Sequence, residues 1–326
     1  MPHPSRPLIV RLRNWVGDVT LGVPTLERLA AAGYSLQLQG KGWAADLLAA
    51  YGWPLQTLAP TLSERVAQLR ALRAEARAAD PGFERRLNSI CFPFSFGSAL
   101  EFRLAGLRAV GQGREARGWL LGRSLPRPQG LHELQVYWQF ADVLLGQALP
   151  APPAIGLRLA PRHREEAAAL RQRYAIGPGY IVVCPFAGGT YEGADKSWPG
   201  FADFVRDTLP AFGRPLVCCP GPAEVALARE RFAGTTVVEG TGLGAYAALL
   251  ADAALMISND TGPGHIAAAV GTPVLSVLGP TDPGQWGAWG PNVTHLKRWP
   301  GWPTADEVAA AAGRLLKDSL STKTPA

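Results

Sequence analysis

Three short segments rich in glycine and polar residues follow apolar runs of the kind that form β-strands. The first is Asn14-Trp-Val-Gly-Asp18, which comes after the apolar run 7–12 and opens a helical pattern. An aspartate at such a place either caps the helix with its side-chain oxygen or faces a substrate hydroxyl as a general base. From this segment alone, both interpretations of Asp18 stay open.

The second segment is Ser258-Asn-Asp-Thr-Gly-Pro-Gly-His265, again directly after an apolar run. Its proline suits the first turn of a helix, so the N–H groups of Thr261 and Gly262 would converge on an anion at the helix N-terminus. Asp260 would repel a phosphate, and we expect it to accept hydrogen bonds from sugar hydroxyls. His265 is either a ligand contact or a buried histidine with partners inside the protein.

The third segment, 186–190, is followed within a few residues by Lys196-Ser-Trp-Pro. Small residues such as Gly189 would let a phosphate approach the backbone, and the Thr190 hydroxyl and Lys196 ammonium could hold it. A diphosphate bound in this way needs no metal ion. The alternative is a flexible surface loop with a solvated lysine.

Motifs of several other enzyme classes do not occur in the sequence. There is no G-x-G-x-x-G fingerprint and no G-x-S-x-G elbow, which disfavours a dehydrogenase and a serine hydrolase. The segment 188–197 fails as a Walker A motif, because two residues separate its second glycine from Lys196. No Asp-x-Asp pair is present and the five histidines are scattered, so we expect no metal site and no cofactor.

The positive charge of the chain is concentrated in its first half. The net charge is +6, and the stretch 64–127 contains twelve arginines, six acidic residues and no lysine. Such a stretch favours an anionic partner, which could be a nucleic acid, an anionic lipid or an acidic saccharide. The alternative is a solvated helical face. No apolar run is long enough to span a membrane and no signal-peptide core is evident, so we expect a cytoplasmic protein.

Alternating strands and helices would position these segments, as in βα units around parallel sheets. Such sheets bind ligands at the carboxyl ends of their strands. The expected strands are 7–12, 35–39, 180–184, 215–219, 236–239, 254–258 and 273–278, with a short apolar run at 90–94, and the expected helices are 19–32, 62–79, 98–107, 131–145, 162–174, 199–209, 223–232, 244–251, 263–270 and 304–317.

The chain is long enough for two domains, and a proline-rich stretch divides it. Prolines at 150, 152 and 153 favour an extended linker. We therefore predict an N-terminal Rossmann-like domain at 1–155 and a C-terminal one at 156–303. A last helix and tail, 304–326, would pack back toward the N-terminal domain.

In their order and spacing, these segments resemble the ADP-heptose:lipopolysaccharide heptosyltransferases of glycosyltransferase family 9. Members of that family have the α/β GT-B architecture, in which two doubly wound Rossmann-like domains face each other across a cleft. The resemblance covers nearly the whole chain. It rests on the segments 14–18 with Pro24, 95–100, 117–121, 196–199, 260–265, 279–287 and 302–304.

The resemblance also implies roles for individual residues. Asp18 takes the place of the catalytic base, in a domain that binds the acceptor. The implied acceptor-binding residues are Asn14, Gly17 and Arg117. The implied donor-binding residues are Gly189, Thr190, Lys196, Glu224, Thr241, Asp260, Thr261, Gly262 and His265.

The implied reaction is an inverting, metal-independent transfer of heptose from ADP-heptose to the Kdo/heptose region of the lipopolysaccharide inner core. The acceptor would be an acidic, lipid-linked oligosaccharide, reached by peripheral contact with the cytoplasmic face of the anionic inner membrane, and no nucleic acid would bind. One alternative is a GT-B enzyme with another donor or acceptor, including a nucleotide-sugar epimerase. The other is a non-catalytic nucleotide-binding or nucleic-acid-binding protein.

Overall fold

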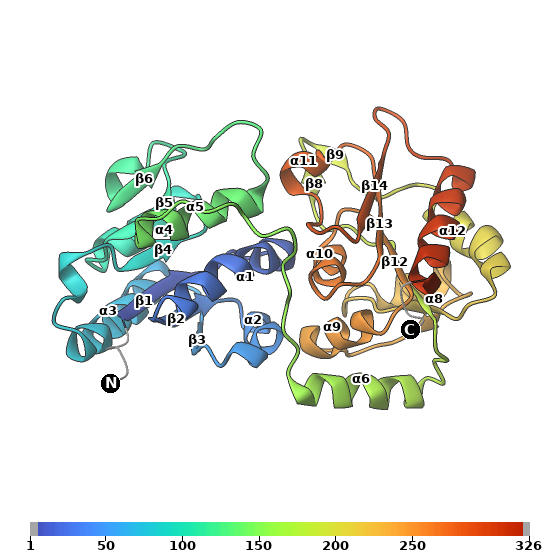
Figure 1. Cartoon of the computed structure of the whole chain (residues 1–326), viewed down its shortest axis with the longest axis horizontal. Helices are drawn as coiled ribbons and strands as arrows, with labels where there is room; N and C mark the ends of the chain where they lie inside the picture. Colours follow the sequence, from blue (N-terminus) through green and yellow to red (C-terminus); the bar gives the residue numbers. More distant parts are fainter. Residues whose placement is uncertain (1–5, 322–326) are drawn as a thin grey trace. The chain divides into compact units, whose positions relative to one another are not determined.

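The computed structural model describes residues 6–321, and the chain divides into two compact units between Pro152 and Pro153. Each unit has its own parallel sheet with helices packed on it (Figure 1). The division lies within the proline-rich stretch at 150–153. The tail at 322–326 lies outside the described residues.

The sheet of unit 1 has six strands, and every neighbouring pair is parallel. Its central strand is buried along most of its length, as expected for a parallel sheet covered on both faces. In sheet order the strands are β3 (Leu55–Thr57), β2 (Tyr34–Gly40), β1 (Arg6–Arg11), β4 (Ser89–Cys91), β5 (Ala109–Gln112) and β6 (Arg123–Leu125).

Two pairs of helices pack on this sheet. The helices α1 (Val16–Ala31) and α5 (Glu133–Leu145) contact each other, and so do α3 (Leu62–Ala79) and α4 (Phe96–Leu104). The bounds of α3 agree with the prediction because a capping box at its N-terminus fixes its start. The shorter helices are α2 (Trp43–Leu47), η1 (Ala49–Tyr51), η2 (Phe83–Arg85) and η3 (Gly118–Leu120).

Unit 2 has a second six-stranded parallel sheet and a small antiparallel hairpin. In sheet order the strands are β11 (Thr236–Val237), β10 (Leu216–Cys218), β7 (Ile181–Cys184), β12 (Leu255–Ser258), β13 (Val274–Leu278) and β14 (Val293–Lys297), and the hairpin is β8 (Thr190–Tyr191) with β9 (Ala194–Asp195).

The helices of unit 2 follow its strands as predicted, except at 199–209 and at the short helix Pro283–Trp286, which was not predicted. The stretch predicted as a single helix at 199–209 consists of three short turns, a helical turn, a π-turn and a 3₁₀ turn that begins before Pro210. The helices are α6 (Pro161–Arg173), α7 (Phe201–Asp203), η4 (Phe204–Thr208), η5 (Leu209–Phe212), α8 (Val225–Arg231), α9 (Leu243–Ala251), α10 (Gly262–Ala269), α11 (Pro283–Trp286) and α12 (Ala305–Ser321).

The last helix, α12, belongs to the core of unit 2. Its residues Val308 and Ala312 are fully buried with Ile257 and Leu275 of the sheet. The helix at 305–321 is thus part of unit 2, and the packing of 304–326 toward the N-terminal domain stays a prediction.

Both sheets have the same strand order, in which the first strand of the unit lies between the second and the fourth. The order of connection reverses between β1 and β4 in unit 1 and between β7 and β12 in unit 2. At such a switch point the loops leave in opposite directions and open a crevice at the carboxyl ends of the strands. The doubly wound α/β fold predicted from the sequence is thereby confirmed.

Candidate functional site

The switch point of unit 2 brings together Lys196 and Asp260, which are 64 residues apart in the chain. Asp260 directly follows β12, and Lys196 directly follows the hairpin that comes after β7. The Lys196 Nζ lies 3.1 Å from Asp260 Oδ2 and 3.3 Å from the Asp260 carbonyl oxygen. Both side chains are mostly shielded from solvent, with exposed fractions of 16% and 13%. The lysine is therefore held against the aspartate rather than solvated on a loop.

Two further side chains surround the Asp260 carboxylate. The Thr281 hydroxyl, which follows β13, donates to Oδ2 over 3.1 Å, and His265 Nε2 of α10 lies 3.9 Å from Oδ1. Burial opposes ionisation of this carboxyl group, but His265 and Lys196 outweigh it and lower the pKa of Asp260 to about 2. Protein donors thus engage Oδ2 of Asp260, and the use of this carboxylate as an acceptor for sugar hydroxyls stays a prediction.

The N-terminus of α10 begins at the same place. Thr261 is the N-cap residue in extended conformation, but its side chain makes no capping bond. Its hydroxyl lies instead 3.6 Å from the thiol of Cys184, at the end of β7. A Cβ atom at Gly264 would come within 2.8 Å of the Ser258 hydroxyl, so this glycine lets the helix pack closely on β12. The first N–H groups of α10, with Gly262 at its first position, are suited to an anion, and Asp260, which contacts Lys196, lies just before them.

The loop that carries Lys196 is a β-hairpin rather than an irregular loop. Gly189 has a φ of 73°, a left-handed conformation that glycine adopts without strain, and Thr190 is exposed in the first hairpin strand. Asn259, a residue that the sequence analysis did not single out, ties this loop to β12. Its side chain accepts from the Trp198 N–H at 3.0 Å and donates to the Pro185 carbonyl at 2.6 Å.

Glu224 and Thr241 follow the two strands on the other side of β7. Glu224 is the N-cap residue of α8, and its carboxylate accepts from the Gly221 N–H at 2.8 Å. The Thr241 hydroxyl is buried and has no hydrogen-bond partner within residues 6–321, and the same holds for the Tyr246 hydroxyl of α9. Buried hydroxyls without partners are costly in a native protein, so these two need an ordered water or a polar ligand as partner.

In unit 1, Asp18 lies at the switch point between β1 and β4. The N-cap residue of α1 is Trp15, so Asp18 lies inside the first turn and the capping interpretation is wrong. Its Oδ1 atom accepts from the Tyr137 hydroxyl of α5 at 2.9 Å and lies 3.5 Å from Arg13 Nη2. Tyr137 was missed by the sequence analysis, since only the packing of α5 on α1 brings it to Asp18.

Charged and aromatic side chains surround Arg13 and Tyr137, two residues that contact Asp18. The Arg13 guanidinium stacks on the Phe94 ring at 3.9 Å from its centroid. Glu133, fully buried one helical turn before Tyr137, pairs with Arg127 at 2.8 Å. Burial raises the pKa of Glu133, although Arg127 and Arg13 oppose the effect. Burial, reinforced by the Asp18 and Glu133 carboxylates, raises the pKa of Tyr137 far above its usual value.

The three predicted acceptor-binding residues have different surroundings. Asn14 is exposed and accepts a hydrogen bond from Arg11 at 3.1 Å, and Gly17 is buried in the first turn of α1. Arg117 is fully buried, and its guanidinium bonds to Ser95, Ser98 and Gln112. The acceptor-binding role of Arg117 is therefore corrected to a structural one, in which it joins η3 to the start of α4.

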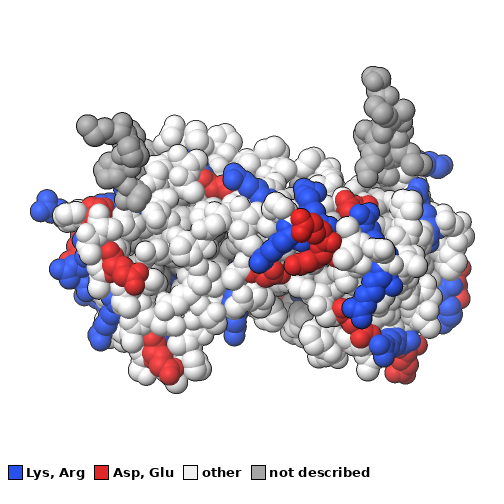
Figure 2. Space-filling model, turned by 90° about the horizontal axis from the view of Figure 1, so that it is seen from below, with Lys and Arg blue, Asp and Glu red and all other residues white. Residues whose placement is uncertain are grey.

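The arginine-rich stretch of unit 1 is partly used inside the unit. Five of its arginines form ion pairs with acidic side chains, and both charges are visible among the surface residues in Figure 2. The remaining exposed arginines include Arg103, Arg114 and Arg123. The pairs are Arg65–Glu101, Arg73–Glu84, Arg77–Glu84, Arg86–Asp80 and Arg127–Glu133.

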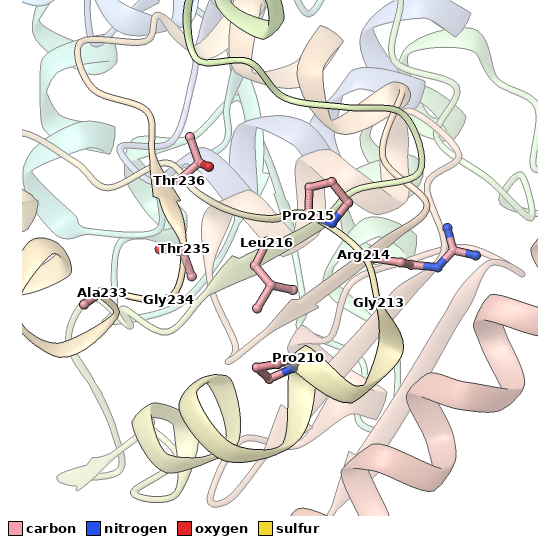
Figure 3. Close-up of a pocket in the computed structure, with 9 residues that line it drawn as sticks. All are labelled: Pro210, Gly213, Arg214, Pro215, Leu216, Ala233, Gly234, Thr235 and Thr236. Atoms are coloured by element: carbon pink, nitrogen blue, oxygen red, sulfur yellow. The ribbon is translucent and has the colours of Figure 1, made fainter.

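A separate hollow of about 500 Å³ lies at the opposite edge of the unit 2 sheet (Figure 3). It is lined by residues at the amino ends of β10 and β11, among them Leu216 and Thr236. The Arg214 side chain points away from it and donates to the Gly179 carbonyl at 2.9 Å. None of the predicted site residues lines this hollow.

The described residues hold neither a cluster of metal ligands nor a helix that could span a membrane. Within residues 6–321, no three His, Cys, Asp or Glu side chains are grouped as ligands for a metal ion. In the same part of the chain, no helix combines the length and the apolar character needed to cross a bilayer.

Both units are thus doubly wound Rossmann-like domains, and two such domains in one chain are the architecture of the GT-B class of glycosyltransferases. Residues 89–311 match the model of glycosyltransferase family 9 (heptosyltransferase). The chain belongs to this family.

Individual relatives agree with this assignment. Lipopolysaccharide heptosyltransferase 3 of Escherichia coli is 34% identical over 146 residues, which cover 40% of this chain and 41% of the relative. Lipopolysaccharide heptosyltransferase 1 of Escherichia coli O18:K1:H7 is 36% identical over 158 residues, 45% of this chain and 48% of the relative. The chain thus matches less than half the length of these curated relatives.

A solved structure extends the likeness of the fold to the whole chain. The structure of E. coli ADP-heptose lps heptosyltransferase II superposes with a TM-score of 0.76 and 19% sequence identity. The superposition covers 96% of this chain and 99% of that one.

Proposed function

We propose that this protein transfers heptose from ADP-heptose to the inner core of lipopolysaccharide, with inversion at the anomeric carbon. The observation that carries the proposal is the pairing of Lys196 with Asp260 beside the N-terminus of α10, at the switch point of unit 2. Membership of family 9 and the names of the relatives, which are lipopolysaccharide heptosyltransferases, support the same donor and acceptor classes.

Unit 2 would hold the donor. The diphosphate would lie on the Lys196 ammonium and the free N–H groups at the start of α10, with Thr190 and Gly189 on the hairpin nearby. These groups supply fixed positive charge for the leaving ADP without a metal ion. His265 would keep Asp260 ionised and in place.

The nucleoside would lie toward the strands on the other side of β7. The Glu224 carboxylate is suited to the ribose hydroxyls, and the unpartnered Thr241 hydroxyl is suited to the base. The order of these residues follows the order of the strands, from diphosphate at β12 and β7 to ribose at β10 and base at β11.

Unit 1 would supply the base. Asp18 would take the proton of the acceptor hydroxyl as that oxygen attacks the anomeric carbon, and the bond from that carbon to ADP would break in the same step. A single displacement of this kind inverts the configuration. The exposed arginines of unit 1, with Asn14, would bind the carboxylates and phosphates of a lipid-linked acidic acceptor, at the cytoplasmic face of the inner membrane.

Calorimetric titration with ADP, GDP and UDP, with and without magnesium, tests the donor assignment. We expect ADP to bind most tightly and magnesium to leave its affinity unchanged. A preference for UDP or GDP, or a requirement for magnesium, would contradict the donor assignment while leaving the fold intact. Consumption of the sugar nucleotide without any acceptor would instead indicate an epimerase.

A further inference from the structure

The two oxygens of the Asp18 carboxylate have different surroundings. Both neighbouring donors, the Tyr137 hydroxyl and the Arg13 guanidinium, approach Oδ1. Within residues 6–321, Oδ2 accepts no hydrogen bond. About a tenth of the Asp18 side chain stays exposed, so the carboxylate is shielded but open to a small group.

We propose that Tyr137 is the positioning residue of Asp18: its hydroxyl holds the carboxylate through Oδ1 and leaves Oδ2 to receive the proton of the acceptor hydroxyl. The proposal rests on the general-base role of Asp18 proposed above. In the step, the acceptor O–H bond breaks, its proton goes to Oδ2, and its electron pair forms the new bond to the anomeric carbon. Tyr137 exchanges no proton and acts only through Asp18.

The setting of Tyr137 fits this role. The side chain is 1% exposed, and its ring packs edge-on against Phe92 with centroids 4.9 Å apart, while Phe140 lies beside it. A ring held in this way keeps its hydroxyl in one place. Burial also keeps the phenol protonated over the range in which an enzyme works, so the hydroxyl stays a donor.

The charged groups that face Asp18 come from two elements. Arg13 lies in the loop after β1, and Glu133 lies on helix α5 one turn before Tyr137. Arg127 neutralises Glu133 from the other side. With Glu133 paired to Arg127, the Tyr137 hydroxyl donates its hydrogen bond to Asp18 Oδ1.

The variant Tyr137→Phe tests the proposal because it removes the hydroxyl and keeps the packed ring. We expect kcat to fall about tenfold to a hundredfold, as for a lost hydrogen bond to a charged group, with the KM for the sugar nucleotide unchanged. We also expect the acid limb of the pH–rate profile to move to higher pH, because the ionised base has lost a donor.

Tyr34→Phe is the matched control. Tyr34 is buried in the same unit, and its hydroxyl donates at 3.3 Å to the Leu144 carbonyl near the end of α5, away from Asp18. A role in stability alone predicts similar effects of both variants, with no shift of the acid limb in either. That result would overturn the proposal.

A double-mutant cycle with Asp18→Asn separates this inference from the proposed function. If Tyr137 acts through Asp18, adding Tyr137→Phe to the Asp18→Asn variant lowers kcat no further. If Tyr137→Phe lowers kcat by the same factor in the wild type and in the Asp18→Asn variant, the positioning role is refuted. Near-normal turnover of Asp18→Asn alone would refute the proposed function itself.

Arg13→Gln provides a second variant in case Tyr137→Phe does not fold. It removes the weaker donor from the same oxygen, so we expect a smaller loss of kcat and a smaller shift of the acid limb in the same direction. If the acid limb of the pH–rate profile is unchanged in Arg13→Gln, the proposal that donors to Oδ1 position the Asp18 carboxylate is contradicted.

Discussion

The Lys196 ammonium and the Asp260 carboxylate lie 3.1 Å apart and neutralise each other in a site suited to a diphosphate. The pair keeps the lysine extended toward the N-terminus of α10 before any ligand arrives. A bound diphosphate would then find the ammonium in position, so less side-chain entropy is lost on binding.

Replacing Lys196 with Met should weaken ADP binding about tenfold to a hundredfold, because a charged donor to the diphosphate is lost. Calorimetric titration with ADP measures this directly. Lys297→Met is the control, since Lys297 is exposed at the end of β14 in the same unit. Equal ADP affinity in Lys196→Met and the wild type would contradict the role of the lysine.

Asp260 should make the stability of the protein dependent on acid pH. The pKa of Asp260 is about 2 in the folded protein and about 3.9 when unfolded, so the folded state favours its ionised form. The resulting stabilisation, about 2 to 3 kcal/mol, is fully present above about pH 5 and is lost as the pH falls through about 2. Urea unfolding at pH 7 and at pH 2.5 measures it.

The control for this prediction is Asp260→Asn, which cannot ionise. Its free energy of unfolding should depend less on pH than that of the wild type over the same range. Parallel losses of stability in both proteins would assign the acid sensitivity to other carboxyl groups.

Replacing Thr241 with Val should separate binding from stability. Valine has nearly the same shape, and the buried hydroxyl that it removes has no protein partner, so stability should stay equal or rise slightly. ADP affinity should fall if the hydroxyl bonds to the nucleoside. Thermal unfolding and titration of the same preparation give both values, and unchanged affinity would exclude a ligand contact at Thr241.

Arg117→Ala should destabilise the protein by about 3 kcal/mol, because the fully buried guanidinium joins η3 to the N-terminus of α4. Its affinity for ADP should not change. Arg123→Ala removes an exposed arginine from the same part of unit 1 and should change stability by less than about 0.5 kcal/mol. Equal stabilities of the two variants, measured by urea unfolding, would contradict the structural role.

Unit 1 should bind anionic vesicles at low salt through its exposed arginines and Trp119, whose side chain is 71% exposed beside Phe96. Trp119→Ser should weaken the sedimentation of the protein with such vesicles, and raising the salt should release it. Trp299→Ser, at an exposed position in unit 2, is the control. Equal binding to zwitterionic vesicles would show that anionic lipid is not the partner.

Much of the fold could be predicted because its signals are local. The helix at 62–79 begins at a capping box, and the buried strands of unit 2 are continuous apolar runs. The short strands β5 and β6 were not predicted, since three or four residues carry too little pattern. The helix predicted at 199–209 failed because Pro210 and Gly213 close the segment with a tighter turn.

The residues of the site that could be predicted are likewise those with a local sequence signal. Lys196 and Asp260 could be selected because each lies within two residues of the end of a hairpin or strand, and Asp18 because it lies where the helical pattern begins after the first strand. Tyr137 and Thr281 could not, since a tyrosine within an apolar helix carries no signal until the helix is packed. Arg117 misled the prediction because a sequence does not reveal that an arginine is buried.

The repetition of one strand order in the two units has a consequence for how such enzymes diverge. Each unit has its own sheet and its own ligand edge, and the chain passes between them only once, at a run of prolines. If unit 1 binds the acceptor and unit 2 the nucleotide, as proposed above, substitutions that alter the choice of acceptor can accumulate in one unit while the other stays the same. New linkages could then arise without a new donor.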